Sequence, residues 1–334
     1  MMDAIPLVCL TAALALYVLV DGFALGIGVL VLLGPRGQDR DAMVETAASA
    51  WPIQATWLCL MGLVLAQAFP LVLTLLPAFY LPLAIMAFAL VMRGVAFRFR
   101  LRPSRLQRVW EYALAGASAL AILCQGFILA GLMHGVKPVV GLESIFGLLC
   151  AAVLLGGDVL LGAGWLIWRA SSAMQTYGRE VGHAALLLVI GATVVAIGWA
   201  LLVEPQSFAL PDALTPLLLL LGAAVCVLIW RNLWTNHVYR IFALGLALFA
   251  LGFAALADAM WMSMGASDVA FAGNVATYAI AFFAGIVLVM TFPLAIGRMF
   301  HKDLGRIDGR NELRKIPHTG CRRSMSLPSE LHFS

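Results

Sequence analysis

The chain has 334 residues, of which 63% are hydrophobic and only 11% are charged, and its formal net charge is +4. This composition excludes a water-soluble globular protein, because a surface that faces water needs far more charge. It predicts an all-α protein that crosses a membrane several times. We expect no nucleic-acid partner for it.

The first predicted element is an apolar run from Ile5 to Leu33. It is about twice as long as the core of a signal peptide. No Lys or Arg precedes it, since the first basic residue is Arg36. We therefore expect this run to stay in the mature protein as a membrane-spanning helix.

Asp21 places a carboxylate near the middle of this run, where a charge costs about 2.5–3.5 kcal/mol on insertion scales. Gly22, Gly26 and Gly28 follow it, so a neighbouring helix can approach closely on this side. Asp21 is therefore expected to face protein or water instead of lipid. Two roles fit it: a carboxylate in a proton relay or hydrated channel, or a hydrogen-bonded carboxyl that holds two helices together.

The rest of the chain contains further apolar segments of the length, about 20 residues, that a bilayer core requires. They lie at 53–75, 78–97, 112–133, 144–168, 184–203, 212–230, 240–259 and 272–297. The sequence thus predicts about nine transmembrane helices in a membrane domain over 1–300. A cytoplasmic tail over 301–334 follows, whose mixture of charge, Gly, Pro and Ser predicts mobility.

The basic residues favour one orientation of these helices. When successive loops alternate between the two sides, every Lys and Arg except Arg93 and Lys137 falls on one side. The positive-inside rule then places the N-terminus outside and the C-terminus in the cytoplasm. The loop from Arg98 to Arg108 is the strongest basic cluster, and we expect it to touch anionic lipid headgroups.

Two residues near the second and third helices are candidates for a polar path. Trp51 precedes the second helix and, with Trp57, is typical of an anchor at the membrane interface. Arg93 lies slightly more than one turn inside the basic loop, beside Gly94. It can extend to the membrane surface, or pair with a buried carboxylate or a partner chain.

The fifth predicted helix repeats a pattern of the first. The sequence Leu25-Gly26-Ile27-Gly28 follows Asp21, and Leu161-Gly162-Ala163-Gly164 follows Asp158. The likeness predicts two four-helix bundles of parallel topology plus a peripheral ninth helix, although small residues also recur in membrane helices for packing alone. The two roles considered for Asp21 apply to Asp158 as well.

Haem, metal and catalytic residues are not expected in this chain. A transmembrane haem usually needs an axial histidine, but no histidine falls near the middle of a predicted helix; His134 and His183 stand at helix ends. No cluster of His or carboxylates has the spacing of a zinc or copper site. The six cysteines are scattered singly, without a C-x-x-C pair or a haem-attachment motif.

Several motifs together resemble those of subunit II of the cytochrome bd-type quinol oxidases. They are DGFALGIGVL at 21–30, the Trp-flanked segment 51–57, AFP at 68–70, FYLPL at 79–83, RGVAFRFR at 93–100, and Trp110 followed by QG at 125–126 and Gly131. The match is close over about residues 12–136. Beyond them, LGAGWLIWR at 161–169 is loosely similar to the family's fifth helix.

The resemblance implies a respiratory complex of the bacterial cytoplasmic (inner) membrane that oxidises quinol and reduces dioxygen to water. In that family haem b and haem d belong to subunit I, and a haem-free, nine-helix subunit II packs against it beside a polar proton path. At matching positions Asp21, Trp51 and Arg93 carry the family's polar residues. Membrane lipid is a further partner; the sequence leaves open a small single-helix subunit, the quinone used, and whether a quinone enters this chain.

Three departures from the family pattern put its usual proton path in doubt. Pro52 replaces an acid after the tryptophan, Arg98 stands where Glu is common, and Leu161 stands where a histidine is expected. A divergent oxidase, such as one of the cyanide-insensitive branch, and a paralogue with another partner both fit. Two other classes stay open: a proton-coupled transporter that uses Asp21 and Asp158, and a structural subunit without a redox role.

Overall fold

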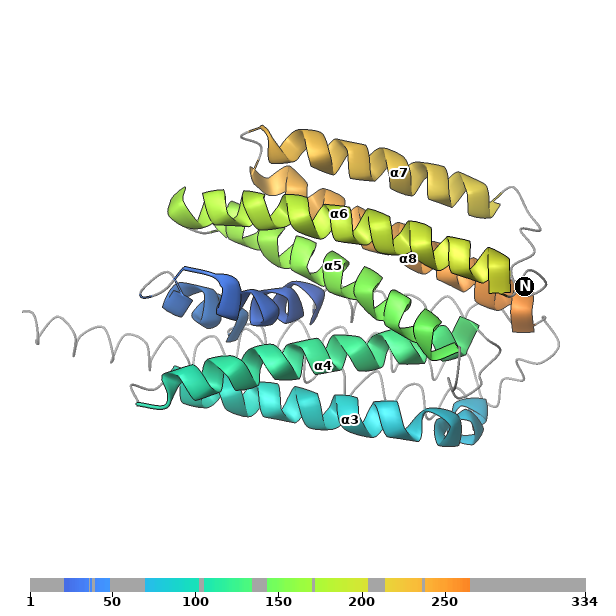
Figure 1. Cartoon of the computed structure of the whole chain (residues 1–334), viewed down its shortest axis with the longest axis horizontal. Helices are drawn as coiled ribbons and strands as arrows, with labels where there is room; N and C mark the ends of the chain where they lie inside the picture. Colours follow the sequence, from blue (N-terminus) through green and yellow to red (C-terminus); the bar gives the residue numbers. More distant parts are fainter. Residues whose placement is uncertain are drawn as a thin grey trace, which may run out of the picture. The chain divides into compact units, whose positions relative to one another are not determined.

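The computed structural model describes residues 21–35, 37, 40–48, 70–101, 105–133, 143–169, 172–203, 214–235 and 238–264. All regular structure in these ranges is α-helical, which confirms the predicted all-α class. The helices are Asp21–Leu33, 40–48, α3 (Pro70–Arg100), α4 (Gln107–Met133), α5 (Glu143–Arg169), α6 (Ser172–Val203), α7 (Leu214–Leu233) and α8 (Val238–Met264), as Figure 1 shows.

Five of the described helices are long and apolar enough to cross a membrane. The spans are Phe79–Arg100, Gln107–Met133, Ser144–Trp168, Met174–Val203 and Pro216–Leu233, and Asp21–Leu33 and Tyr239–Ala255 are shorter apolar helices. A helix satisfies its backbone hydrogen bonds internally, which is what lipid requires of a spanning segment. The predicted ninth helix at 272–297 and the tail at 301–334 lie outside the described residues.

The predicted break between the second and third helices is wrong. The sequence placed a boundary between 75 and 78, but α3 is continuous from Pro70 to Arg100 and contains Pro77 and Pro82. Pro70 suits the first turn, where a backbone N–H has no intrahelical partner. An interior proline removes one hydrogen bond, and the remaining bonds of a long apolar helix keep the segment helical.

Two segments expected in loops are helical. Residues 40–48 form a short helix inside the predicted loop 34–52, and α6 begins at Ser172 instead of 184. The start of α6 is too polar for a hydropathy prediction of a span, but Gln175, Arg179 and Glu180 are good helix formers. Hydropathy therefore located the membrane part of α6 and missed its polar extension.

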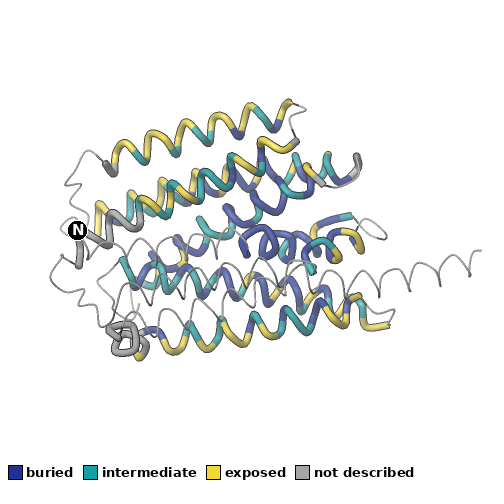
Figure 2. Tube along the Cα trace, turned by 180° about the vertical axis from the view of Figure 1, so that it is seen from behind, coloured by how far each residue is buried: buried dark blue, intermediate teal, exposed yellow. Residues whose placement is uncertain are grey.

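Helix α5 lies at the centre of the packing. In its most apolar window 56% of the residues are buried, against 11% in α7, and Figure 2 shows the same contrast along the chain. Leu161 and Leu166 of α5 join a hydrophobic cluster with the helix Asp21–Leu33, the helix 40–48, α3 and α4. Leu160 and Ile167 join a second cluster with α6, α7 and α8.

This arrangement agrees with the second of the two predicted bundles. Helices α5, α6, α7 and α8 share the second hydrophobic cluster, which contains Ala185, Ile229 and Ile241 besides the two α5 residues. The first predicted bundle includes residues before 21 and between 51 and 69, which lie outside the described part of the chain.

Candidate functional site

A buried ion pair joins the helix Asp21–Leu33 to α3. Nη1 of Arg93 donates a hydrogen bond to Oδ1 of Asp21 over 2.8 Å. The side chains of Arg93 and Asp21 are 1% and 3% exposed, so water does not screen this pair. The Arg93 guanidinium also lies 5.7 Å from the centre of the Phe97 ring. Of the alternatives that the sequence left for Arg93, the structure shows pairing with a buried carboxylate.

Asp158 of α5 lies next to this pair. Only 1% of Asp158 is exposed, and the charges of both Asp21 and Arg93 act on its carboxyl. A Cβ atom added at Gly22 would lie 2.8 Å from Oδ1 of Asp158, so the glycine beside Asp21 leaves the room that this carboxyl occupies. The structure therefore brings three of the four predicted site residues together.

The Asp158 carboxyl is unusual in one of its two oxygen atoms. Its Oδ2 atom is buried and meets no donor or acceptor among the residues that the structure describes. A buried polar atom of this kind ordinarily takes a water molecule or carries a proton. Two carboxyls and one guanidinium, all of them buried, thus form a site that can hold or pass a proton.

The repeated glycine motif forms the crossing between the first helix and α5. A Cβ atom at Gly26 would collide with the backbone carbonyl of Asp158. In the other direction, a Cβ at Gly162 would lie 2.8 Å from the backbone nitrogen of Ile27. The two copies of the motif therefore pack against each other, and this close contact holds Asp158 beside Asp21.

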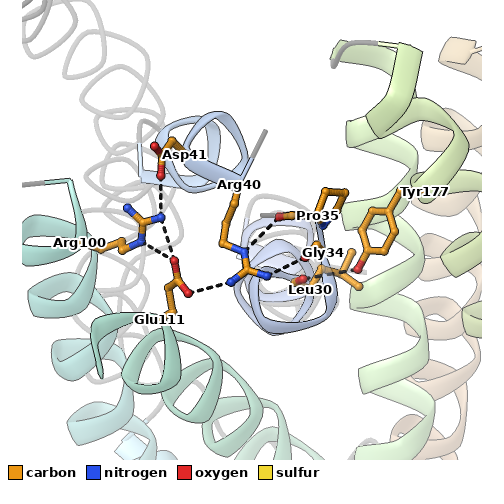
Figure 3. A network of polar contacts seen from close by, with 8 residues as sticks. All are labelled: Leu30, Gly34, Pro35, Arg40, Asp41, Arg100, Glu111 and Tyr177. Carbon is orange, nitrogen blue, oxygen red and sulfur yellow. Dashed lines mark hydrogen bonds and ion pairs between the residues drawn. The ribbon is translucent and has the colours of Figure 1, made fainter. Parts of the chain in front are cut away.

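A second polar network lies where α3 ends and α4 begins (Figure 3). Glu111 of α4 accepts hydrogen bonds from Arg40 over 2.8 Å and from Nε of Arg100 over 2.9 Å. Nη2 of Arg100 also donates to Asp41 over 2.6 Å. Glu111, Arg40 and Arg100 are buried, whereas the Asp41 side chain is 59% exposed. The network ties the helix 40–48 to α3 and α4.

The same Arg40 side chain closes the C-terminus of the first helix. Its Nη2 donates to the carbonyl of Gly34 over 2.6 Å, and its Nε donates to that of Pro35 over 3.1 Å. The chain then turns through Gly37, whose φ of 85° lies in the left-handed region that glycine adopts readily. Arg40 thereby satisfies carbonyls that a helix end would otherwise leave without donors.

Sequence reasoning missed this network. The hydropathy pattern predicts loops at residues 40, 41 and 111, and of the network only Arg100 belongs to the predicted basic cluster. One signal was present: Glu111 is an acid directly after a strongly basic loop, and acids near a membrane boundary seek basic partners. The network borders a polar cavity of about 220 Å³ that Gln107 and Arg108 also line.

We expect Glu111→Ala to destabilise the chain by about 3 kcal/mol, because it leaves two buried guanidinium groups without their shared carboxylate. Asp41→Ala is the matched control, since it removes the exposed acid that binds the same arginine and is expected to cost less than about 1 kcal/mol. Thermal unfolding of the purified chain in detergent measures both. Equal losses for the two variants would contradict the buried role of Glu111.

His183 corrects one detail of the sequence prediction. It was expected at a helix end, but α6 begins earlier, so His183 lies inside the span Met174–Val203. Its Nδ1 atom lies 2.8 Å from the carbonyl oxygen of Arg179, which can only accept a hydrogen bond, so Nδ1 carries the proton. Its ring contacts the rings of Trp230 and Trp234 of α7 at centroid distances of 5.0 and 5.1 Å. The ring is thus packed between two helices.

The departures from the family pattern have structural counterparts where they are described. Leu161, where a histidine is expected, is fully buried and fills the space that Gly22 and Gly245 leave on two neighbouring helices. Arg98 is exposed on α3. Trp51 and Pro52 lie outside the described residues. No three His, Cys, Asp or Glu residues in the described ranges come together as metal ligands would.

Comparisons with known proteins agree on one family. The family model described as cytochrome bd terminal oxidase subunit II matches residues 2–301. A probable cytochrome oxidase subunit 2 of Haemophilus influenzae is 26% identical over 196 residues, which cover 54% of this chain and 52% of that protein. A cytochrome bd ubiquinol oxidase subunit 2 of Bacillus subtilis is 29% identical over 119 residues, covering 34% of this chain and 35% of that one.

A solved structure shares the fold. A chain in the structure of bd oxidase from Geobacillus thermodenitrificans has a TM-score of 0.73 and 16% identity, and the match covers 90% of this chain and 99% of that chain. The sequence matches to the two curated relatives span about half and about a third of their lengths. The family model, in contrast, extends over most of this chain, which belongs to the cytochrome bd terminal oxidase subunit II family.

Proposed function

We propose that this chain is the haem-free second subunit of a bd-type terminal oxidase that oxidises quinol and reduces dioxygen to water. Its partner is a haem-bearing subunit I, which supplies haem b and haem d. This chain supports assembly of the complex and contributes a buried polar route for protons. The observation that carries the proposal is the Asp21–Arg93 pair with Asp158 beside it, in a chain of this family.

The arrangement along α3 supports a route toward the basic side of the membrane. Arg93 and Arg100 are seven residues apart, which puts them on one face of the helix about 10 Å apart along its axis. Arg100 borders the polar cavity, and Arg93 holds Asp21. Phe97 lies on the same face between them and is buried. In this proposal a proton enters at the cavity, and water molecules carry it past the Phe97 ring to the two buried acids, because the ring has no group that can take up a proton.

The proposed location is the bacterial cytoplasmic membrane, with the N-terminus outside and the C-terminus in the cytoplasm. The support is the uneven distribution of Lys and Arg among the loops. In this orientation the end of α3 at Arg100 and the start of α4 at Gln107 face the cytoplasm, the side from which a bd-type oxidase takes protons. The polar cavity then opens toward the source of protons.

The first test is purification of this chain from its native membrane in mild detergent, with identification of co-purifying proteins and a reduced-minus-oxidised spectrum of the same sample. A large partner with b-type and d-type haem bands supports the oxidase. Loss of those bands when the partner is removed by a second purification step supports the haem-free role. A stable, haem-free preparation without such a partner would favour a transporter or a structural paralogue.

We expect Asp21→Asn to lower oxygen-reduction turnover of the complex by about tenfold or more, because a positioned proton-transfer group is lost. The double variant Asp21→Asn with Arg93→Gln separates this role from helix packing, since it removes both charges together and restores electrical balance. A double variant that regains stability but not turnover supports the proton route. If the double variant recovers both stability and turnover, Asp21 serves only in helix packing.

A further inference from the structure

One face of α4 is exposed along its first three turns and changes character from basic to apolar. Arg105, in the turn before the helix, and Arg108 are exposed at its beginning. Val109 and Tyr112 follow at 55% and 65% exposure, and Gly116 is exposed one turn further on. Within the helix, the spacing of four residues keeps Arg108, Tyr112 and Gly116 on one side, and Arg105 lies in the turn that leads into them.

The basic end of this face carries arginines whose charge is not neutralised by an acid of the described residues. Arg40 and Arg100, on the neighbouring elements, are neutralised by Glu111 and Asp41. Arg105 and Arg108, in contrast, form no ion pair within the part of the chain that the structure describes. Arg108 also borders the polar cavity of about 220 Å³, which gives a polar group room next to the helix end.

The apolar end of the face has space for a chain of methylene groups. A Cβ atom added at Gly116 would meet no atom of the described residues within 4 Å, and Gly116 is exposed, so the surface is open there. Tyr112 stands one turn from Arg108, and an aromatic ring with a polar tip is typical of residues that meet lipid headgroups. A ligand that fits must therefore be anionic at one end and apolar for several ångströms beyond it.

We propose that this α4 face binds one anionic phospholipid. The phosphate lies against Arg105 and Arg108, and an acyl chain runs along Val109 and Tyr112 to Gly116. Basic pockets beside transmembrane helices are known to hold such headgroups. A bilayer supplies this ligand at the membrane boundary where the arginines stand. Its anionic headgroup matches the two arginines, and its acyl chain matches the open apolar strip beyond them.

The test is native mass spectrometry of the purified complex with added dioleoyl phosphatidylglycerol or dioleoyl phosphatidylcholine. Each arginine near an anionic lipid contributes about fivefold to affinity. We therefore expect Arg105→Gln with Arg108→Gln to weaken phosphatidylglycerol binding by about thirtyfold. The matched control is Arg231→Gln with Arg240→Gln, which removes two exposed arginines of α7 and α8 and is expected to leave this binding unchanged.

A second pair of variants tests the apolar strip. Gly116→Leu fills the open space on α4 and is expected to release the lipid, whereas Gly191→Leu fills an equally open position on α6 and is expected to have no effect.

Equal weakening of lipid binding by both arginine pairs would overturn the site in favour of general charge attraction. Displacement of the lipid by inorganic phosphate, without any effect of Gly116→Leu, would make it a free-anion site. If Tyr112 can be cross-linked to another polypeptide in the complex saturated with lipid, protein and not lipid covers this face. That result would also overturn the proposal.

Discussion

Replacing Arg93 with glutamine is expected to destabilise the chain by about 3–5 kcal/mol, because Asp21 would keep its place in a dry interior without its guanidinium partner. Both side chains are at most 3% exposed, so water cannot take over the lost interaction. Arg98→Gln is the matched control: it lies on the same helix, is exposed, and forms no ion pair within the described ranges. We expect it to change stability by less than about 0.5 kcal/mol.

Thermal unfolding of the purified complex in detergent measures this difference. The double variant Asp21→Asn with Arg93→Gln should recover most of the loss, since a neutral amide pair can share a hydrogen bond without a buried charge. The recovery would assign the loss in the single variant to the orphaned Asp21 carboxylate. If Arg93→Gln and Arg98→Gln unfold at the same temperature, the buried pair contributes nothing to stability.

Gly26→Ala is expected to be the most damaging small substitution in the described helices. The added methyl group would collide with the backbone carbonyl of Asp158, and a backbone atom cannot move aside without separating the two helices. Overpacking of this kind costs about 1–3 kcal/mol, and we expect a value at or above the upper end of that range. The separation would also move Asp158 away from Asp21, so turnover should fall together with stability.

Gly191→Ala is the control for this substitution. An added Cβ at Gly191 on α6 meets no atom of the described residues within 4 Å, and alanine is a better helix former than glycine by about 1 kcal/mol. We therefore expect Gly191→Ala to be neutral or slightly stabilising, the opposite sign from Gly26→Ala. Size-exclusion chromatography of the detergent extract, followed by thermal unfolding, compares the two. A Gly26→Ala chain that is as stable as Gly191→Ala would contradict the close crossing.

The sequence alone predicted the helical class, the position of several spans and the family. These features depend on local properties: the length of an apolar run, the spacing of small residues, and a set of motifs read in order. The prediction that a neighbouring helix approaches closely at Gly22, Gly26 and Gly28 was also correct, because small residues in a membrane helix predict a close neighbour. What the sequence could not supply was which two helices approach each other.

The tertiary structure decided the partners. Arg93 had three open alternatives in the sequence, and only the packing of α3 against the first helix selects Asp21. Glu111 lies 71 residues from Arg40 along the chain, and nothing in local pattern links them. An ion pair in a dry interior is stable only when its geometry is complete, and that geometry comes from the whole arrangement of helices.

The same distinction explains the errors at the helix ends. Hydropathy reports where a segment meets lipid, so it placed the start of α6 at 184 and left Arg179 in a loop. In the structure Arg179 is helical, and its Nη1 donates to the carbonyl oxygens of Leu233 over 2.8 Å and Thr235 over 2.6 Å, at the end of α7. The length of the apolar runs determined where the chain enters lipid. Contacts between distant segments decided where its helices end and which charged residues pair, because the partners of buried polar groups come together only when the helices pack.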